Sequence, residues 1–196
     1  MAARWQVVLG VTAAGLVVAA PLVYASQRNT HLRNFRVVED GVLYRSGQLT
    51  PTGLDRVVYE RGIKTLVTLR TSRVAGKLPP DTWEEEFCAS HGLKHVRIVP
   101  RVWGADEKGE IPAEEAVHEF LGVMRDPKNY PVLVHCFAGI HRTGTMCAIF
   151  RMEFHHWSAD RAIAEMELYG FDPLDMKENI EGYLRGYIPR WKQATK

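Results

Sequence analysis

The chain has 196 residues, of which 46% are hydrophobic, and its formal net charge is +2. That length fits one domain of ordinary size plus an appendage, and the apolar content is enough for a real core. The small charge, with no run of Lys or Arg, argues against a nucleic-acid partner. The three cysteines do not suggest a disulfide framework.

The N-terminus differs in composition from the rest of the chain. Residues 7–25 are nearly all apolar and carry no charged side chain, and a stretch of that length can just cross a bilayer as a helix. We favour an uncleaved membrane anchor because the stretch is longer than the apolar part of a typical signal peptide. The alternative is a signal peptide, with Arg4 ahead of the apolar stretch and cleavage before Ser26.

The side of the membrane stays open at this point. More arginines follow the apolar stretch closely than precede it, which by the positive-inside rule favours the cytoplasm. Signal cleavage would instead give a secreted or periplasmic protein. We therefore predict two parts, with residues 1–34 as membrane anchor or signal peptide plus linker and residues 35–196 as the folded domain. The membrane is a predicted partner through residues 7–25 if they are uncleaved.

Beyond residue 34, short β-branched or apolar runs alternate with longer stretches that place apolar residues on one helical face. Strands are predicted at residues 35–38, 42–44, 64–69, 94–99 and 132–134. Helices are predicted at residues 50–61, 81–91, 113–125, 143–157, 158–169 and 176–190. The alternation predicts an α/β fold with a mainly parallel central sheet flanked by helices, to which the N-terminal apolar helix is added.

One segment, directly after the strand at 132–134, specifies a reaction. Residues 135–144 read His-Cys-Phe-Ala-Gly-Ile-His-Arg-Thr-Gly, and five residues separate Cys136 from Arg142. Such a spacing allows one tight turn around a small anion, with backbone N–H groups converging on its centre. The helix beginning near Arg142 or Thr143 adds unpaired N–H groups and the positive end of its dipole. Both features favour bound phosphate, and both favour a thiolate over a thiol.

Each residue type in this loop has a chemical role. Cys136 is the predicted nucleophile, Arg142 can bind two phosphate oxygens at once, and Gly139 permits a sharp turn. The hydroxyl of Thr143 can reach back to the sulfur and ease its departure, and His135 can order the loop and sustain the thiolate. The predicted substrate-binding residues are Phe137, Ala138, Gly139, Ile140, His141 and Arg142. The alternative is an inert, buried cysteine at a strand end.

The motif His-Cys-x-x-Gly-x-x-Arg-Thr-Gly resembles the signature loop of the cysteine-based protein tyrosine phosphatases, especially the dual-specificity branch with its atypical plant, fungal and bacterial members. The resemblance extends over roughly residues 33–190. It implies that residues 35–196 are the catalytic domain of a phosphatase that works through a cysteinyl-phosphate intermediate and needs no metal or other cofactor. Flanking matches lie at residues 35–38, 43–48, 63–70 and 129–136.

One position departs from the family pattern. The nearest relatives usually carry lysine where this chain has Ile140, and that lysine helps to hold highly phosphorylated inositols or lipids. The resemblance therefore favours phosphotyrosine, phosphoserine or phosphothreonine in proteins, or small phosphoesters, as substrates. Inositol phosphates and phosphoinositides remain the alternative.

Cleavage of a phosphoester also needs a proton for the leaving oxygen, and a carboxylic acid on a mobile loop is a common donor. Asp106 lies thirty residues before Cys136, in the place where the resembling family keeps its acid loop. Asp106 is our first choice for the general acid, with Glu107 and Glu110 as the other candidates. A solvated loop without chemistry is the remaining interpretation.

Several further residues have weaker claims to function. Arg45 and Arg70 follow strands and are candidates to line the phosphate approach or to form surface salt bridges. Cys147 is expected to pack in the core. The resemblance implies one more alternative, a protective disulfide between Cys88 and oxidised Cys136.

Two other functions compete with the phosphatase hypothesis. The first is a catalytically weak, phosphate-binding adaptor on a membrane, which gains weight if no acid serves the loop. The second is a sulfurtransferase or arsenate reductase, because these enzymes also use a cysteine in an anion-binding loop. The Arg142-Thr143-Gly144 sequence and the acid-bearing stretch upstream argue against the second.

Overall fold

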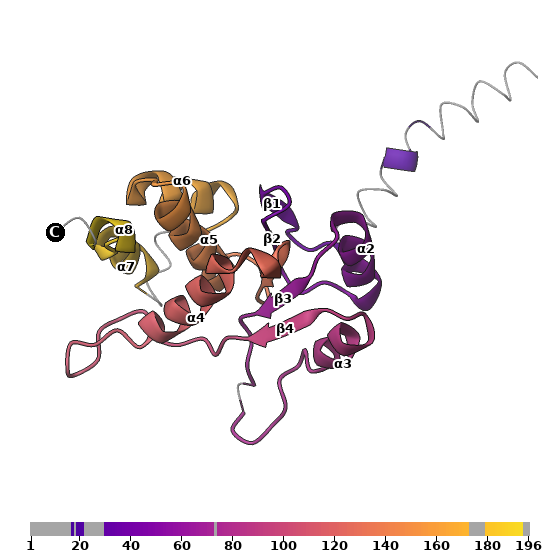
Figure 1. Cartoon of the computed structure of the whole chain (residues 1–196), viewed down its shortest axis with the longest axis horizontal. Helices are drawn as coiled ribbons and strands as arrows, with labels where there is room; N and C mark the ends of the chain where they lie inside the picture. The colour runs from indigo at the N-terminus through magenta and orange to yellow at the C-terminus, as the bar shows by residue number, and fades with distance from the viewer. Residues whose placement is uncertain (1–16, 18, 22–29, 73, 173–178, 194–196) are drawn as a thin grey trace, which may run out of the picture.

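The computed structural model describes residues 17, 19–21, 30–72, 74–172 and 179–193. A five-stranded sheet in the order β1-β2-β5-β3-β4 forms the centre of the molecule (Figure 1). Its β1–β2 pair is antiparallel and the other three pairs are parallel. The strands are β1 (Arg36–Glu39), β2 (Leu43–Ser46), β3 (Thr65–Thr68), β4 (Lys94–Arg97) and β5 (Val132–His135). The predicted α/β fold is confirmed, with a mixed sheet.

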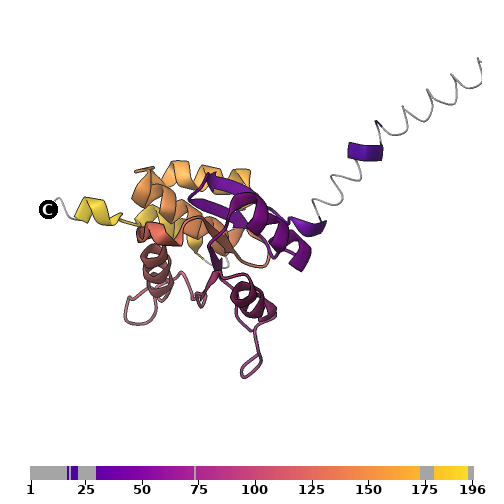
Figure 2. The same ribbon diagram turned by 45° about the vertical axis from the view of Figure 1, so that its right-hand side comes forward.

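Helices cover both faces of this sheet. In two views, α2 and α3 lie on one side and the helices from α4 to α7 lie on the other (Figures 1 and 2). The α-helices are α2 (Pro51–Arg61), α3 (Trp83–Ser90), α4 (Ala113–Arg125), α5 (His141–Phe154), α6 (Ala159–Leu168), α7 (Ile180–Gly186) and α8 (Arg190–Gln193). A short 3-10 helix, η1 (Pro127–Asn129), precedes β5.

The strands serve two cores because successive side chains of a strand point to opposite faces. Leu66 and Leu133 pack with the residues of α2 and α3. Val67 and Val134 face the larger core, which is built with α4, α5, α6 and α7. The central strands are therefore buried on both faces, as their nearly continuous apolar sequence predicts.

Two predicted helices differ from the observed ones. The helix predicted at 143–157 begins two residues earlier and ends at Phe154. The helix predicted at 176–190 is wrong in its described part, which contains α7, a break at Tyr187, and then α8. Pro189 explains the break, because proline cannot donate to a preceding helical carbonyl and disfavours the helical conformation of the residue before it.

Most of the predicted N-terminal apolar helix, residues 7–25, lies outside the described residues. Within the part of the chain that the structure describes, no helix is long and apolar enough to cross a membrane. Residues 33 and 34, in the predicted linker, are described and contact the body of the domain.

Candidate active site

The loop of residues 136–142, here called the anion loop, follows the central strand of the sheet. Strand β5 lies between β2 and β3 and runs parallel to both. The chain leaves β5 at His135 and enters α5 at His141. The anion loop therefore lies at the carboxyl ends of three parallel strands, where open α/β sheets bind their ligands.

The sulfur of Cys136 lies within this turn. Cys136 is 5% exposed, and its Sγ accepts a hydrogen bond from the backbone N–H of Gly139 at 3.2 Å. Gly139 has a φ of +75°, and a Cβ at this position would lie 2.4 Å from the backbone nitrogen of Gly47. Only glycine fits here, both for its conformation and for the close approach of the chain after β2.

Donors from outside the anion loop bind its carbonyl groups. The backbone N–H of Gln48 donates to the carbonyl of Phe137 at 3.0 Å. The side chain of Asn34 donates to Ala138 at 2.8 Å, and Arg45 Nη2 donates to Gly139 at 2.7 Å. Because three successive carbonyls are bound on the outside of the turn, the N–H groups that follow them are directed to its inside. This is the geometry of an anion-binding nest.

Arg45 lies behind the anion loop and does not line a phosphate approach from solvent. The residue is 1% exposed, its Nη1 has no hydrogen-bond partner, and its guanidinium lies over the ring of Tyr169 at 5.1 Å. None of the ion pairs among the described residues involves Arg45. A buried positive charge next to the loop favours a bound anion.

Arg142 and Thr143 lie where the anion loop enters α5. Arg142 is half-buried, and its Nη1 contacts the carbonyl oxygen of Leu69 at 3.5 Å. Arg142 also lines a small hollow together with Trp103 and Met146. The hydroxyl of Thr143 is buried and has no hydrogen-bond partner, so it is available to a group bound in the loop.

The rim of the site combines an aromatic ring with two cations. Phe137 is 56% exposed, and its ring lies under the guanidinium groups of Arg33 at 4.3 Å and Arg70 at 5.3 Å. Ile140 is half-buried against the larger core, and the ring of His141 meets Phe171 edge-on at 5.7 Å. An anionic substrate that enters past Phe137 meets positive charge before it reaches Cys136.

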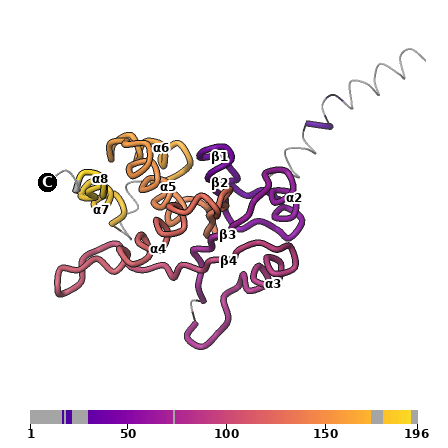
Figure 3. Tube along the Cα trace, viewed as in Figure 1, coloured from indigo at the N-terminus to yellow at the C-terminus, as the bar shows by residue number. Residues whose placement is uncertain are grey.

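Asp106 lies in a segment that is separate from the anion loop. Residues 101–112, here called the acid loop, extend away from the sheet before the chain returns to α4 (Figure 3). The exposed Asp106 carboxylate accepts hydrogen bonds from the N–H groups of Lys108 at 2.8 Å and Glu110 at 2.9 Å. The hollow that it lines with Glu110 and Glu114 contains no residue of the anion loop. In this structure the Asp106 carboxylate caps the turn in which Asp106 itself lies. For the carboxylate to contact a substrate at Cys136, the acid loop would have to move.

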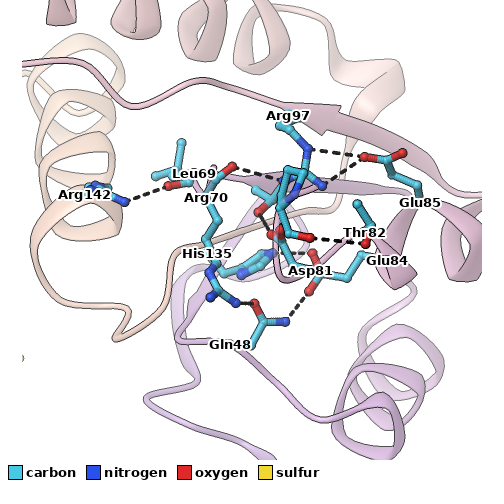
Figure 4. A network of polar contacts seen from close by, with 12 residues as sticks. Gln48, Leu69, Arg70, Asp81, Thr82, Glu84, Glu85, Arg97, His135 and Arg142 are labelled. Carbon is cyan, nitrogen blue, oxygen red and sulfur yellow. Dashed lines mark hydrogen bonds and ion pairs between the residues drawn. The ribbon is translucent and has the colours of Figure 1, made fainter. Parts of the chain in front are cut away.

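His135 is joined to a buried carboxylate that the sequence did not single out. Its Nε2 lies 3.0 Å from Oε2 of Glu84, on α3, and both side chains are 2% exposed. Oε1 of Glu84 accepts a hydrogen bond from Gln48 Nε2 at 2.5 Å, and Gln48 Oε1 accepts one from Arg70 at 2.5 Å. In Figure 4, dashed lines join the carboxylate of Glu84 to both Gln48 and His135.

No sequence signal selects Glu84, because Glu84, Glu85 and Glu86 are consecutive and only the fold turns the first of them inward. A signal for Gln48 exists, since it closes one of the segments that resemble the phosphatase family. Asn34 was assigned to the linker, and nothing in its surroundings in the sequence predicts its contact with Ala138.

A second pair, between the buried carboxylate of Asp81 and the partly exposed guanidinium of Arg97, lies beside the first. Asp81 accepts hydrogen bonds from Thr68 at 2.5 Å and Arg97 at 2.9 Å. Burial by itself would raise the pKa of Asp81, but these two hydrogen bonds and the charge of Arg97 outweigh it and lower the pKa below its usual value. The pair therefore contributes stability above the ordinary pKa of an aspartate, and acidification through the folded-state pKa removes it.

Asp81, Glu84 and His135 each place a potential metal-ligand atom within 4.8 Å of the others. The Asp81 carboxylate already binds a guanidinium, and Glu84 and His135 contact each other. The three side chains thus belong to a network of protein contacts, and a cation would have to displace Arg97.

The other two cysteines are core residues. Cys88 and Cys147 are free thiols that are 1% and 0% exposed. Burial raises the pKa of Cys88 to about 12, with a further contribution from the charge of Glu84. Burial likewise raises the pKa of Cys147 to about 11. Neither thiol has the properties of a nucleophile at neutral pH.

The sequence of this chain matches a family model and several characterised relatives. Residues 16–181 match a family model described as DSP-PTPase phosphatase fused to NAD+ kinase. The tyrosine-protein phosphatase-like protein OCA2 of Saccharomyces cerevisiae is 27% identical over 145 residues, which cover 74% of this chain and 67% of OCA2. The inositol diphosphatase DSP3 of Arabidopsis thaliana is 28% identical over 137 residues, which cover 68% of this chain and 61% of DSP3.

A solved structure shows the same fold. The crystal structure of Pseudomonas aeruginosa TpbA in complex with phosphotyrosine matches with a TM-score of 0.63 at 18% identity, covering 83% of this chain and 90% of that one. At this identity the match concerns the fold alone.

Proposed function

The chain belongs to the dual-specificity phosphatase branch of the protein tyrosine phosphatase-like family, and we propose that it hydrolyses phosphomonoesters through a cysteinyl-phosphate intermediate on Cys136. One observation carries the proposal: the Sγ of Cys136 accepts the N–H of Gly139 inside a turn whose carbonyls are bound from outside. The N–H groups inside such a turn can stabilise both the thiolate and the phosphoryl group that is transferred to it.

The first step transfers the phosphoryl group to the enzyme. The thiolate of Cys136 attacks phosphorus, an S–P bond forms, and the P–O bond to the leaving group breaks in line with it. Arg142 and the loop N–H groups stabilise the equatorial oxygens. In the second step water attacks phosphorus, the S–P bond breaks and inorganic phosphate leaves. We propose that the Thr143 hydroxyl, which is buried without a hydrogen-bond partner, assists the departing sulfur.

The leaving oxygen takes a proton in the first step, and Asp106 is the proposed donor. Loops that bear acids commonly close only when substrate is bound. Its position on an exposed loop is compatible with such a movement, although its present hydrogen bonds to Lys108 and Glu110 must then break.

We propose phosphoproteins as the substrates, because Ile140 leaves the anion loop less basic than a lysine there would. Phosphotyrosine is the ligand named for the TpbA complex, whose fold this chain shares. Inositol diphosphates are a second candidate, favoured by a specific observation. The guanidinium groups of Arg33 and Arg70 flank Phe137 at the rim, where they suit a substrate with more than one phosphate.

Cys136→Ser tests the mechanism. We expect turnover of p-nitrophenyl phosphate to fall by at least about 10³-fold, because the nucleophile is lost, while vanadate or phosphate binding remains measurable by calorimetry. Cys147→Ser is the matched control and should retain activity if the variant folds. Undiminished turnover by the Cys136 variant would refute the mechanism. Absence of turnover in the wild type, with binding intact, would favour a phosphate-binding adaptor.

The substrate class needs a separate measurement. Phosphate release from phosphotyrosine and phosphoserine peptides is compared with release from an inositol diphosphate under identical conditions. The proposal expects higher kcat/KM for a phosphopeptide. Higher kcat/KM for the inositol diphosphate would instead indicate that Arg33 and Arg70 at the rim bind a second phosphate group of the substrate.

A further inference from the structure

We propose that Arg45 is a positioning residue of the phosphatase site. Its buried guanidinium holds the peptide group between Gly139 and Ile140 from outside the anion loop, and a dianion bound inside the loop compensates its charge. The inference rests on the proposed function, because that dianion is the phosphoryl group of the substrate. Arg45 belongs to β2, a different part of the chain from the signature motif.

The burial of Arg45 needs an explanation, because a charged side chain is costly to bury unless an opposite charge pairs with it. Arg45 is 1% exposed, and a guanidinium keeps its proton in proteins, so loss of the charge does not remove this cost. Its Nη2 donates to the carbonyl of Gly139 at 2.7 Å. Its Nη1 is buried and has no hydrogen-bond partner. The contacts of Arg45 therefore satisfy its charge only in part.

No carboxylate among the described residues forms an ion pair with Arg45. The charges of Glu165 and Arg45 both act on the buried thiol of Cys147, but the Glu165 carboxylate is bound by Arg151 at 2.8 Å. The ring of Tyr169 lies 5.1 Å from the Arg45 guanidinium, and the face of an aromatic ring offsets only part of a full charge. In the part of the chain that the structure describes, Arg45 thus lacks an anionic partner.

The first turn of α5 lies beside the same guanidinium and does not compensate it. A Cβ at Gly144 would lie 3.4 Å from Arg45 Nη2, so the two groups are neighbours. This turn of α5 contains no acidic residue, and no side chain caps it. Because the N-terminus of a helix carries positive partial charge, two positive groups lie side by side. A dianion in the anion loop is the group that would compensate both.

The hydrogen bond from Arg45 also orients one N–H group of the loop. The peptide group between Gly139 and Ile140 is trans, and in a trans peptide the C=O and N–H bonds point in opposite directions. A Gly139 carbonyl held outside the turn therefore directs the N–H of Ile140 to the inside. A charged donor on the carbonyl also polarises the peptide group and strengthens its N–H as a donor. Arg45 thus acts on a bound phosphoryl group without contacting it.

The test is the affinity of the full chain for tungstate, a tetrahedral dianion, measured by calorimetry in a buffer without other oxyanions. Arg45→Met keeps a long side chain but removes the charge, and we expect its dissociation constant to rise at least about tenfold. Arg36→Met is the matched control, because the exposed Arg36 lies over the same Tyr169 ring at 5.8 Å. Its dissociation constant should stay within about twofold of the wild type.

Urea unfolding separates this role from a purely structural one. We expect tungstate to raise the urea midpoint of the wild type and to raise that of Arg45→Met by less, because a ligand stabilises the folded state according to its affinity. An unchanged dissociation constant in Arg45→Met would overturn the proposal. An equal fall in the urea midpoint with and without tungstate would also overturn it, since that result indicates that Arg45 only supports the fold.

If Arg45→Met does not fold, Arg45→Gln replaces it, because a neutral amide also removes the charge while keeping a donor for the Gly139 carbonyl. We then expect at least about fivefold weaker binding of tungstate, and unchanged binding would again overturn the proposal. Turnover of p-nitrophenyl phosphate by the wild type is measured alongside. Tungstate binding without turnover would contradict the proposed function alone.

Discussion

The anion loop is bound on its outer side by three residues from two other segments of the chain, whereas the tip of the acid loop, among the described residues, forms hydrogen bonds only within itself. Gln48, Asn34 and Arg45 each donate to a carbonyl of the anion loop. At the tip of the acid loop, Asp106 accepts from Lys108 and Glu110, and its own N–H donates to Glu110.

This difference matches two separate requirements of the proposed reaction. Stabilising the charge of a transferring phosphoryl group needs donors that do not reorganise during the reaction. Delivering a proton tolerates a group that arrives with the substrate and leaves with the product. An anion loop fixed by contacts from other segments suits the first requirement, and an exposed acid loop held by its own hydrogen bonds suits the second. The following variants test each loop.

The largest loss of activity is expected for a variant of the anion loop. Arg142→Lys should lower kcat by about 10²–10³-fold, because an ammonium group does not reproduce the two parallel hydrogen bonds of a guanidinium. Steady-state kinetics with a phosphotyrosine peptide measure the loss. Arg101→Lys, which borders the same hollow as Arg142, is the control. A loss of less than about threefold would show that the site needs only a positive charge at this position.

A variant of the acid loop should give a somewhat smaller effect. Asp106→Asn is expected to lower kcat about 10²-fold for phenyl phosphate, whose leaving group needs protonation, and to remove the falling alkaline limb of the pH–rate profile. The asparagine oxygen can still accept from Lys108 and Glu110, so the turn is preserved. Glu107→Gln serves as the control within the same loop. A normal profile in the Asp106 variant would leave Asp106 as a turn-capping residue and transfer the search to Glu110.

A pair of glycine variants compares the packing of the two loops. Gly139 and Gly109 both have positive φ, at +75° and +79°, but a Cβ at Gly139 meets backbone atoms of Ser46 and Gly47 while one at Gly109 meets nothing within 4 Å. We expect Gly109→Ala to lower the free energy of unfolding by about 1 kcal/mol and Gly139→Ala by about 2–3 kcal/mol, since the second adds a clash to the backbone strain. Urea unfolding measures both. Equal losses in the free energy of unfolding would show that the anion loop adapts to an added Cβ as easily as the acid loop does.

The sequence predicted the order of strands and helices well, because apolar periodicity and helix caps are local. Thr50 and Ser158 cap α2 and α6 by accepting from Gly53 and Arg161, as their positions suggest. The break before Pro189 was missed because helical periodicity continues on both sides of it. The antiparallel β1–β2 hairpin follows from its short turn.

The site was predictable only as far as it is contiguous. Cys136, Gly139 and Arg142 lie in one turn, so their spacing alone implies a common centre. Glu84 and Asn34 reach this turn from distant parts of the chain, and the sequence does not reveal such contacts. Whether Asp106 takes part in the reaction depends on loop movement and is likewise not encoded in spacing.

The contacts made by Asn34 and Arg33 have a practical consequence for dissecting the protein. A fragment cut to begin at the first strand would retain every residue of the signature motif. It would nevertheless lose the donor to Ala138, the Arg33 carbonyl that accepts the N–H of Gly47 at 2.7 Å, and one of the two cations over Phe137. Truncations that aim to remove the apolar N-terminus should therefore start before His31, whose Nδ1 also contacts the Thr50 hydroxyl at 2.8 Å.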